Sequence, residues 1–423
     1  MNNISHKPEL MAPAGDWIML RAAVSNGADA IYFGLDKLNM RAKAANFTVE
    51  ELPEIISFCK EHNVKTYLTL NTIVFEEELA ELEEIIKASK KNNVDRIICS
   101  DLAVADLCYK YQLPFCISTQ SSISNSLAAD VYKRMGAVRI VLARECSLDE
   151  IKKIRAKTDL EIEAFVHGAM CIAVSGRCFM SHHLFGKSAN RGECVQPCRR
   201  EYEVYDSSID KSLIVGEDYI MSPKDLCTIE FIDQLIESGI DSFKIEGRKR
   251  APEYVAKVVS VYRQAIDLYF ADKDGKHENL LTDEKKKELL SELEKVYNRG
   301  FSSGFYFDVP SSEEYAGVHG SRSTTRKVYI GKVVNYFKDI EIAHIILETG
   351  NLNVGDNILI IGETTGVLEI KIELMSVNDK TNQTAKKGDE ITLKIPSLVR
   401  RNDKVYLIKH IDKSNWTFTF KSK

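Results

Sequence analysis

A sequence pattern that recurs in the first 250 residues constrains the fold of this chain most strongly. At 26–31, 93–97, 136–140 and 239–243, a glycine or asparagine ends an amphipathic segment and a short aliphatic run follows. Glycine and asparagine can take the left-handed conformation that closes a helix. Aliphatic runs with β-branched residues are typical of buried strands. Each copy of the pattern therefore predicts a helix end that leads into a strand.

Counting such runs gives eight expected strands, separated mostly by segments long enough to be helices. They are centred near Leu10, Ile31, Leu68, Ile97, Ile117, Ile140, Phe165 and Phe243. Eight strands that alternate with helices predict an α/β fold, a (β/α)8 TIM-like barrel. The run at 139–143 fits a parallel sheet that is covered on both faces. An open doubly wound sheet is the alternative, but no Gly-x-Gly-x-x-Gly turn follows the first strand.

The pattern changes twice along the chain. We expect the barrel at 1–250, with a cysteine-bearing insertion at 168–226 that follows the seventh strand. A helical extension and linker is expected at 251–326, with helices at about 252–270 and 283–297 packed on the barrel exterior. From 327 to 423, short alternating strands and Gly-Asp turns predict a small C-terminal β-barrel.

Four cysteines crowd into the insertion, and their spacing is not that of a zinc ribbon. They are Cys171, Cys178, Cys194 and Cys198. Thiolates suit zinc or iron–sulfur centres, and four of them can hold a 4Fe-4S cluster or a closed structural zinc site. Ordinary buried thiols are the alternative. The other six cysteines lie on expected helices and strands, so we expect them in the core, although Cys227 is an alternative to Cys198 as fourth ligand.

Active sites of such barrels lie where strands end, so polar residues at those ends become site candidates. They are Asn71, Asp101, Thr119, Gln120, Arg144, Glu145, His167, Glu246 and Arg248. Among candidates for catalysis are His167, Arg248 and Glu163, although a lone histidine at a strand end is more often simply hydrogen-bonded. Glu163 alternates with Phe165 and would face the barrel interior, where it needs a cation such as Lys244 or Arg144. A purely structural ion pair explains Glu163 equally well.

The composition of the chain limits the classes of function that it can have. With 423 residues, of which 44% are hydrophobic, the chain can bury the cores of two or three domains. A formal net charge of −5 argues against coating nucleic acid through bulk charge, but basic stretches occur at 177–200 and 244–250. The first residues lack the apolar core of a signal peptide, and no run is long enough to cross a bilayer. We expect a cytoplasmic protein with no membrane association, in which cysteines serve as ligands or core residues.

Several segments together resemble the collagenase-like peptidase family U32. They are 9–15 (ELMAPAG), 163–171 (EAFVHGAMC), 175–178 (SGRC), 190–199 (NRGECVQPCR) and 244–248 (KIEGR). The resemblance spans nearly the whole chain, and its length is most similar to the tRNA branch of the family. That branch implies 5-hydroxyuridine formation at the wobble position, with a 4Fe-4S cluster on Cys171, Cys178, Cys194 and Cys198 and with prephenate as a required metabolite.

The resemblance also implies two partners, a tRNA anticodon loop and a small dicarboxylate metabolite. Arginine binds phosphates and carboxylates through paired hydrogen bonds, so Arg177 and Arg248 are candidates for either anion. Arg177, Arg144 and Lys244 are the residues we expect at a small-anion site. An oligomer or a paralogue partner is left open.

Two other functions compete with RNA hydroxylation. The family name implies a peptidase, but the sequence contains no His-Glu-x-x-His motif and no Gly-x-Ser-x-Gly elbow. A non-catalytic RNA-binding factor with a structural zinc is the third reading. The identity of the metal separates that reading from the first.

Overall fold

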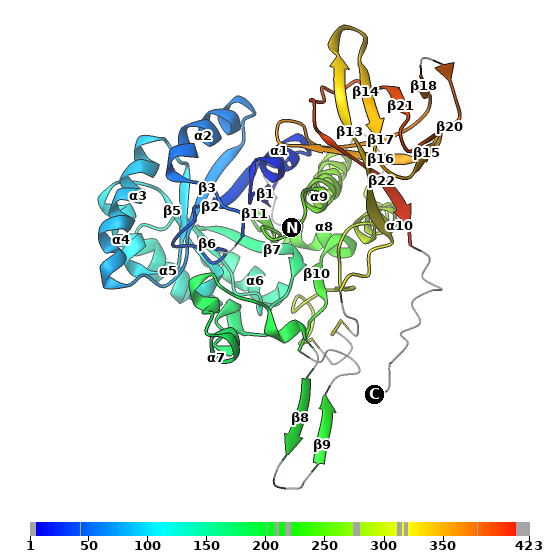
Figure 1. Ribbon diagram of the computed structural model, residues 1–423. Helices are drawn as coiled ribbons and strands as arrows, with labels where there is room; N and C mark the ends of the chain where they lie inside the picture. Colours follow the sequence, from blue (N-terminus) through cyan, green and yellow to red (C-terminus); the bar gives the residue numbers. More distant parts are fainter. Residues whose placement is uncertain are drawn as a thin grey trace.

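Eight parallel strands close into a barrel at the positions that the sequence predicts (Figure 1). The computed structural model describes residues 6–411 except 43, 201, 207, 209–210, 216–220, 274–279, 311–314, 317–319 and 379. The barrel strands are β1 (Glu9–Pro13), β2 (Ala30–Gly34), β3 (Lys65–Leu70), β4 (Arg96–Cys99), β5 (Phe115–Ile117), β6 (Arg139–Val141), β7 (Glu161–Ala169) and β11 (Ser242–Ile245). Closure comes from β11, which pairs in parallel with both β1 and β7. The (β/α)8 prediction is confirmed.

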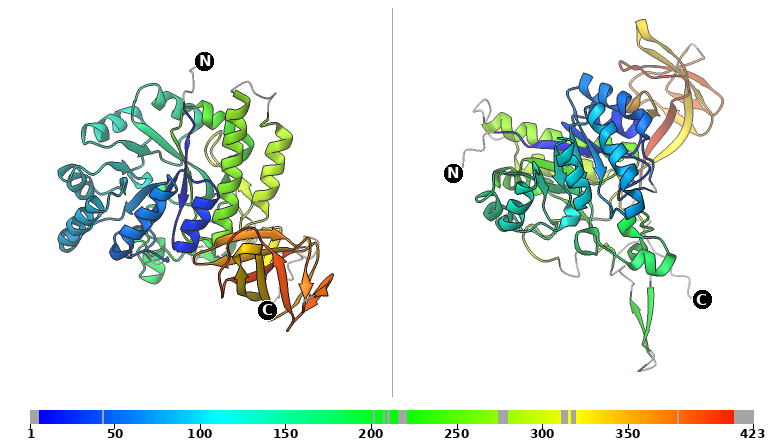
Figure 2. Two further views of the ribbon diagram at one scale, coloured as in Figure 1. Left: turned by 90° about the horizontal axis from the view of Figure 1, so that it is seen from above. Right: turned by 90° about the vertical axis from the view of Figure 1, so that its left-hand side faces the viewer.

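Helices surround the barrel (Figure 2). They are α1 (Trp17–Ser25), α2 (Leu52–Glu61), α3 (Leu79–Lys91), α4 (Leu102–Lys110), α5 (Ser126–Arg134), α6 (Leu148–Arg155), α8 (Ile232–Glu237), α9 (Pro252–Lys273) and α10 (Asp283–Glu294). The recurring pattern ends helices as expected. Positive φ angles between 59° and 95° occur at Gly27, Asn93, Gly136 and Gly239. Apolar faces of these helices and the outer faces of the strands form the main core.

The helix at the start of the expected extension belongs to the barrel wall. In α9, Val255, Val259 and Tyr262 are fully buried in the main core, together with Leu289 and Leu293 of α10. A barrel of eight strands needs a helix after its last strand to cover the seam between β11 and β1. The segment 251–326 therefore begins with the eighth helix of the barrel, and α10 packs beside it (Figure 2).

Alternation along the strands gives the barrel a separate interior. Met11, Ala30, Tyr32, Tyr67, Ile98 and Cys116 form a small apolar cluster apart from the main core. These residues follow the period of two that turns every second side chain inward. The same period places Glu9, Arg139, Glu161 and Glu163 inside, so the amino-terminal end of the barrel is charged rather than aliphatic.

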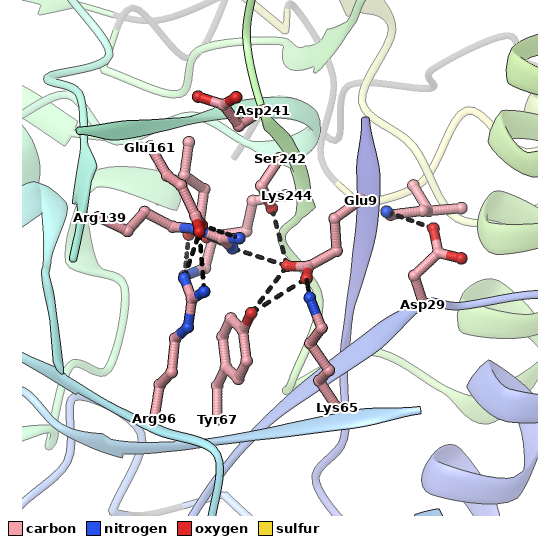
Figure 3. Close-up of polar contacts among 12 residues, drawn as sticks. Glu9, Asp29, Lys65, Tyr67, Arg96, Arg139, Glu161, Asp241, Ser242 and Lys244 are labelled. Atoms are coloured by element: carbon pink, nitrogen blue, oxygen red, sulfur yellow. Dashed lines mark hydrogen bonds and ion pairs between the residues drawn. The ribbon is translucent and has the colours of Figure 1, made fainter. Parts of the chain in front are cut away.

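These charges form one network, which we call the barrel floor (Figure 3). Arg139, 2% exposed, contacts Glu9 at 2.6 Å, Glu161 at 2.5 Å and Glu163 at 3.0 Å. The fully buried Glu163 also binds Lys244 at 2.7 Å. Sequence reasoning anticipated Lys244 as the cation for Glu163, but Arg144, the other cation suggested, is not its partner in the described residues. The second cation is Arg139, which reaches Glu163 because both side chains turn into the barrel.

The insertion after β7 leaves the barrel and returns to the same strand. It contains α7 (Met180–Phe185) and an antiparallel hairpin, β8 (Tyr202–Asp206) with β9 (Lys211–Val215), which extends away from the barrel (Figures 1 and 2). The segment then re-enters as β10 (Asp225–Cys227), antiparallel to residues 167–169 of β7. A short strand, β12 (Phe301–Ser302), pairs with β10.

The C-terminal domain is antiparallel and has its own core, as expected. Its strands are β13 (Thr325–Phe337), β14 (Ile342–Leu347), β15 (Asn351–Asn353), β16 (Asn357–Gly362), β17 (Gly366–Lys371), β18 (Ser376–Val377), β19 (Lys380–Thr381), β20 (Thr384–Lys386), β21 (Glu390–Lys394) and β22 (Lys404–His410). The two Gly-Asp turns have positive φ at Gly355 and Gly388. The domain contacts the barrel through Arg21, whose Nε donates to the carbonyl of Glu363 at 3.0 Å.

We predict that Arg139→Met lowers the free energy of unfolding of the barrel by about 3–5 kcal/mol, because it leaves buried carboxylates without their cation. The matched control is Lys133→Met, which removes a pair with Asp159 whose side chains are 48% and 74% exposed. That control should change the stability by less than about 1 kcal/mol. Urea unfolding of both variants measures the difference, and equal effects would contradict a stabilising floor.

Candidate active site at the barrel mouth

A cavity of about 160 Å³ lies at the carboxyl ends of the barrel strands, and we call it the mouth cavity. Strand residues Tyr32, Thr69, Val141, Phe165 and Lys244 line its barrel side. Across from them, the loop after β7 contributes all four clustered cysteines, Cys171, Cys178, Cys194 and Cys198. The topology therefore brings the cysteine segment to the position where barrel enzymes carry their active sites.

Two of the thiols accept hydrogen bonds from the backbone. The N–H of Met180 donates to Cys178 Sγ at 3.3 Å, and the N–H of Gln196 donates to Cys194 Sγ at 3.4 Å. Gln196 has a φ of 55°, a left-handed conformation that this tight loop between Cys194 and Cys198 requires. Hydrogen bonds to ligand sulfurs stabilise the thiolate form and tune the potential of an iron–sulfur centre.

The fourth cysteine is electrostatically coupled to the other three. Burial raises the pKa of the Cys198 thiol, the charges of Cys171, Cys194 and Cys178 act in the same direction, and Arg199 opposes them. Across the described part of the chain, no three His, Cys, Asp or Glu side chains are arranged closely enough to hold a single metal ion. The four thiols thus share one cavity but are not gathered around one point.

Cys227 lies elsewhere. It is 6% exposed in β10, where its Sγ accepts a hydrogen bond from the Tyr262 hydroxyl at 3.9 Å, and burial raises its pKa to about 12. It is not among the described residues that line the mouth cavity. The other five cysteines outside the cluster, Cys59, Cys99, Cys108, Cys116 and Cys146, are also buried, as expected for core residues.

Arg199 anchors the end of the cysteine segment. Its guanidinium donates to Ser222 Oγ at 2.9 Å, to the carbonyl of Pro223 at 2.7 Å and to the carbonyl of Met170. Glu145 holds the other part of the segment by accepting from the N–H of Ser175 at 3.1 Å. These contacts fix Cys198 and Cys171 relative to the end of β7.

The mouth cavity carries a surplus of positive charge. Six of the residues that line it are cationic, namely Arg41, Arg144, Arg199, Lys244, Arg248 and Lys249, whereas Glu246 is the one carboxylate among the described lining residues. Burial would raise the pKa of Glu246, but Arg41 at 2.9 Å, Arg144 and Arg248 hold it at about 2. A concave site lined by one sign of charge concentrates ligands of the opposite sign.

Arg248 and Arg144 are held in place around this cavity. Arg248, 4% exposed, donates to Thr69 Oγ1 at 3.0 Å and to Asn39, and burial lowers its pKa to about 10. Arg144 lies 4.0 Å from the centre of the Phe165 ring and donates to the carbonyl of Ala169 at 3.1 Å. The buried Nε of Arg144 has no hydrogen-bond partner in the described residues. Arg144 thus lines the cavity with one guanidinium donor that no described residue engages.

Some of the other site candidates line the mouth cavity, and others lie outside it. Asn71, Thr119, Gln120, Glu246 and Arg248 line the mouth cavity. Asp101 instead caps α4, accepting from the N–H of Ala103 at 3.0 Å, and Arg177 is exposed outside the lining. Glu163 lies in the barrel floor and reaches the cavity only through Lys244.

The candidate His167 lies outside the mouth cavity. It is 2% exposed, packs against the rings of Tyr254, Tyr262 and Phe301, and its Nδ1 lies 3.4 Å from the Tyr262 hydroxyl. Burial, together with the charge of Arg250, lowers its pKa to about 3. His167 is therefore neutral near neutral pH and supports the packing behind β7.

Sequence reasoning missed Arg41, which lines the mouth cavity, and the buried Asn39, which accepts a hydrogen bond from Arg248. Both lie in the loop after β2, several residues beyond the strand end, so a search limited to the strand ends passes over them. The signal that could have found them is the length of that loop, which carries polar residues across the mouth.

Aromatic and basic side chains lie on segments close in sequence to residues that line the mouth cavity. Phe179 is 77% exposed, and the half-exposed rings of Phe75 and Phe185 lie 4.6 Å from the guanidinium of Arg191 and 4.5 Å from that of Arg200, respectively. We call these residues the mouth rim. Stacked arginine and aromatic groups of this kind suit the unstacked bases and phosphates of single-stranded RNA.

Comparison with known proteins identifies the family. The model of peptidase family U32 matches residues 15–316. The chain belongs to peptidase family U32. Among similar proteins, an uncharacterized protease of Methanocaldococcus jannaschii is 44% identical over 95% of this chain and 98% of its own length. A collagenase of Porphyromonas gingivalis is 40% identical over 94% and 97%. A tRNA hydroxylation protein of Bacillus subtilis is 42% identical over 80% of each chain.

These U32 relatives carry names from two activities at nearly equal identity, so similarity alone does not choose between proteolysis and RNA hydroxylation. The chemistry of the site therefore has to distinguish the two activities. Within the described residues, each helix is too short or too polar to cross a membrane.

We predict that the pair of Glu246 with Arg41 stabilises the fold near neutral pH and loses this contribution as pH falls from 4.5 towards 2. The sign follows because the folded-state pKa of the carboxyl lies below its ordinary value, so the unfolded chain binds the proton first. Glu246→Gln should therefore be less stable than the parent near neutral pH, with a difference that shrinks on acidification. Urea unfolding across this pH range measures it, and a constant difference would rule out the linkage.

Proposed function

We propose that this U32 protein is a tRNA-modifying enzyme that hydroxylates C5 of the wobble uridine to form 5-hydroxyuridine. The observation that carries the proposal is the convergence of four thiols and six cations on one cavity at the barrel mouth. A redox centre and an anion-binding site in one cavity fit an oxidative reaction on an anionic substrate. The similarity to the tRNA hydroxylation protein of Bacillus subtilis supports the choice of RNA.

Cys171, Cys178, Cys194 and Cys198 would hold a 4Fe-4S cluster. The residues fit this group, because all four thiols line a cavity larger than a single ion needs and two of them already accept backbone N–H groups. A zinc ion would need four sulfurs within about 2.3 Å of one point. When bound, the cluster would supply one-electron transfer beside the substrate. Arg199 and Glu145 would act as positioning residues, since they fix the segment that carries the thiols.

Arg144, Lys244 and Arg248 would bind the small dicarboxylate, for which prephenate is our proposal. Arg144 has a buried Nε without a partner in the described residues, and the planar guanidinium suits a carboxylate. Lys244 shares its charge with Glu163, so it would contribute less than the two arginines. Arg177 lies at the surface and would instead meet an RNA phosphate.

The tRNA anticodon loop would dock on the mouth rim. Phe75, Phe179 and Phe185 offer exposed rings, and Arg200 offers charge beside Phe185, whereas Arg191 beside Phe75 is paired with Glu78. A loop nucleotide that is splayed out of its stack could then enter the mouth cavity, as single-stranded RNA is usually read. Hydroxylation inserts one oxygen atom into the C5–H bond to give C5–OH: an oxygen-atom donor gives up its oxygen and is reduced by two electrons, and the hydrogen of C5 becomes the hydroxyl hydrogen. The buried walls of the cavity keep the reacting base away from bulk water.

The family name makes proteolysis the competing function. No histidine lines the mouth cavity in the described part of the chain, so a cysteine there has no neighbouring imidazole to act as a base. The third reading, an RNA-binding factor with a structural zinc, shares the rim with our proposal and differs from it in the metal.

We predict that Cys194→Ala abolishes 5-hydroxyuridine formation, because the thiol lines the proposed redox site. The measurement is nucleoside mass spectrometry of tRNA from a strain that lacks its own wobble hydroxylation and carries this chain. Cys108→Ala, which removes a buried core thiol of α4, is the matched control and should retain the modification. Unchanged 5-hydroxyuridine with Cys194→Ala would refute the assignment, as would its absence with the parent chain.

We predict that the protein purified without oxygen contains about four irons and four sulfides per chain, and that Cys198→Ala loses them whereas Cys227→Ala does not. The reason is that Cys198, and not Cys227, lines the cavity with the other three thiols. Iron, sulfide and zinc analysis with an absorption spectrum measures this. One zinc and no iron would favour the structural-zinc reading, and iron loss in the Cys227 variant alone would reverse the ligand assignment.

A further inference from the structure

Four groups on one wall of the mouth cavity form a chain of hydrogen bonds that the proposed function does not use. The N–H of Met40 donates to Asn71 Oδ1 at 3.1 Å, and Asn71 Nδ2 donates to Ser118 Oγ at 3.4 Å. The Ser118 hydroxyl in turn donates to Gln120 Oε1. All four residues line the cavity. The chain therefore ends on an amide at the cavity wall.

The direction of this chain is fixed at its first member. A backbone N–H can only donate, so the oxygen of the Asn71 amide must face Met40 and its nitrogen must face Ser118. With that hydrogen bond accepted, the single O–H of Ser118 is available to the oxygen of Gln120. Gln120 Nε2 is left as the free end, and it has no hydrogen-bond partner among the described residues.

Gln120 is also held on a rigid support. It is the middle residue of the short 3-10 turn Thr119–Ser121, which Ser122 closes with a φ of 52°. Thr119 Oγ1 donates to the carbonyl of Leu142 at 3.1 Å and ties this turn to the end of the neighbouring strand β6. Ser118 is 3% exposed. The wall therefore offers an oriented N–H donor rather than a mobile amide.

We infer that Gln120 is the specificity-determining residue that selects a uracil over a cytosine, by donating from Nε2 to the carbonyl oxygen at C4 of the base. Uracil has an acceptor at this position, whereas cytosine has an amino group that can only donate. If the amide turned its oxygen towards that amino group, the O–H of Ser118, which is 3% exposed, would lose its acceptor, and a buried donor without a partner costs free energy. Asn71 and Ser118 are positioning residues. The inference rests on the proposed function, because it assumes that a pyrimidine enters the mouth cavity.

The selection test uses two anticodon stem–loop RNAs that differ only in U or C at the wobble position. Their affinity for the holoenzyme is measured by fluorescence anisotropy, and their hydroxylated nucleosides are measured by mass spectrometry after expression with matching tRNA genes. Gln120→Glu keeps the shape and the acceptor for Ser118 but replaces the free donor by an acceptor. Gln112→Glu, the same change at an exposed residue before β5, is the control.

We predict that the parent chain and Gln112→Glu prefer the uridine RNA by about 10- to 100-fold, the range expected for one hydrogen bond in a protected site. Gln120→Glu should reverse or abolish this preference. Asn71→Asp removes the donor to Ser118 and frees the Gln120 amide to turn, so it should reduce the discrimination more than it reduces binding of the uridine RNA.

Equal loss of both RNAs with Gln120→Glu would overturn the inference, since Gln120 would then bind a different molecule. An unchanged preference in that variant would overturn it as well. If the parent chain binds the two RNAs with the expected preference but hydroxylates neither, the proposed reaction fails while the base selection stands. If it hydroxylates uridine and Gln120→Glu does so at the same rate and with the same selectivity, the reaction stands and the inference fails.

Discussion

The ion network at the barrel floor is the interaction on which the rest of the molecule depends. Arg139 of β6 joins carboxylates of β1 and β7, and Lys244 of β11 completes the set through Glu163. These strands include the three that meet where the barrel closes. Aliphatic layers would fill the same volume, but they would not specify which strands face each other, whereas paired charges penalise a shifted register because any unpaired carboxylate stays buried.

The floor also determines how charge is distributed above it. Glu163 partly neutralises Lys244 from below, so the positive charge at the mouth comes mainly from loop residues such as Arg41, Arg144 and Arg248. Strand residues therefore serve mainly stability, and the loops carry most of the proposed ligand chemistry, which is the usual division between strands and loops in this fold. Arg199 extends this division into the insertion, where it fixes the cysteine segment rather than meeting a ligand.

Much of the fold could be predicted from the sequence because its signals are local. The glycines at helix ends and the short apolar runs mark the eight strands without reference to distant residues, and the spacing of the cysteines marks the insertion. The partner of Glu163 and the place of His167 depend on contacts between strands far apart in the chain, so periodicity could not distinguish Arg139 from Arg144. The exclusion of Cys227 from the cavity likewise follows from the antiparallel pairing of β10 with β7, which no local pattern announces.

That pairing has a consequence for how the cysteine segment is positioned. The insertion starts at the end of β7 and ends on the same strand. Folding of the barrel therefore brings the two ends of this long loop together and offsets the entropy that closing the loop costs. The cavity that the four thiols line is consequently formed by the folding of the barrel, in contrast to small zinc domains that are unfolded without their ion. The proposed cluster would therefore be inserted into a chain that is already folded, and its loss would leave the barrel intact.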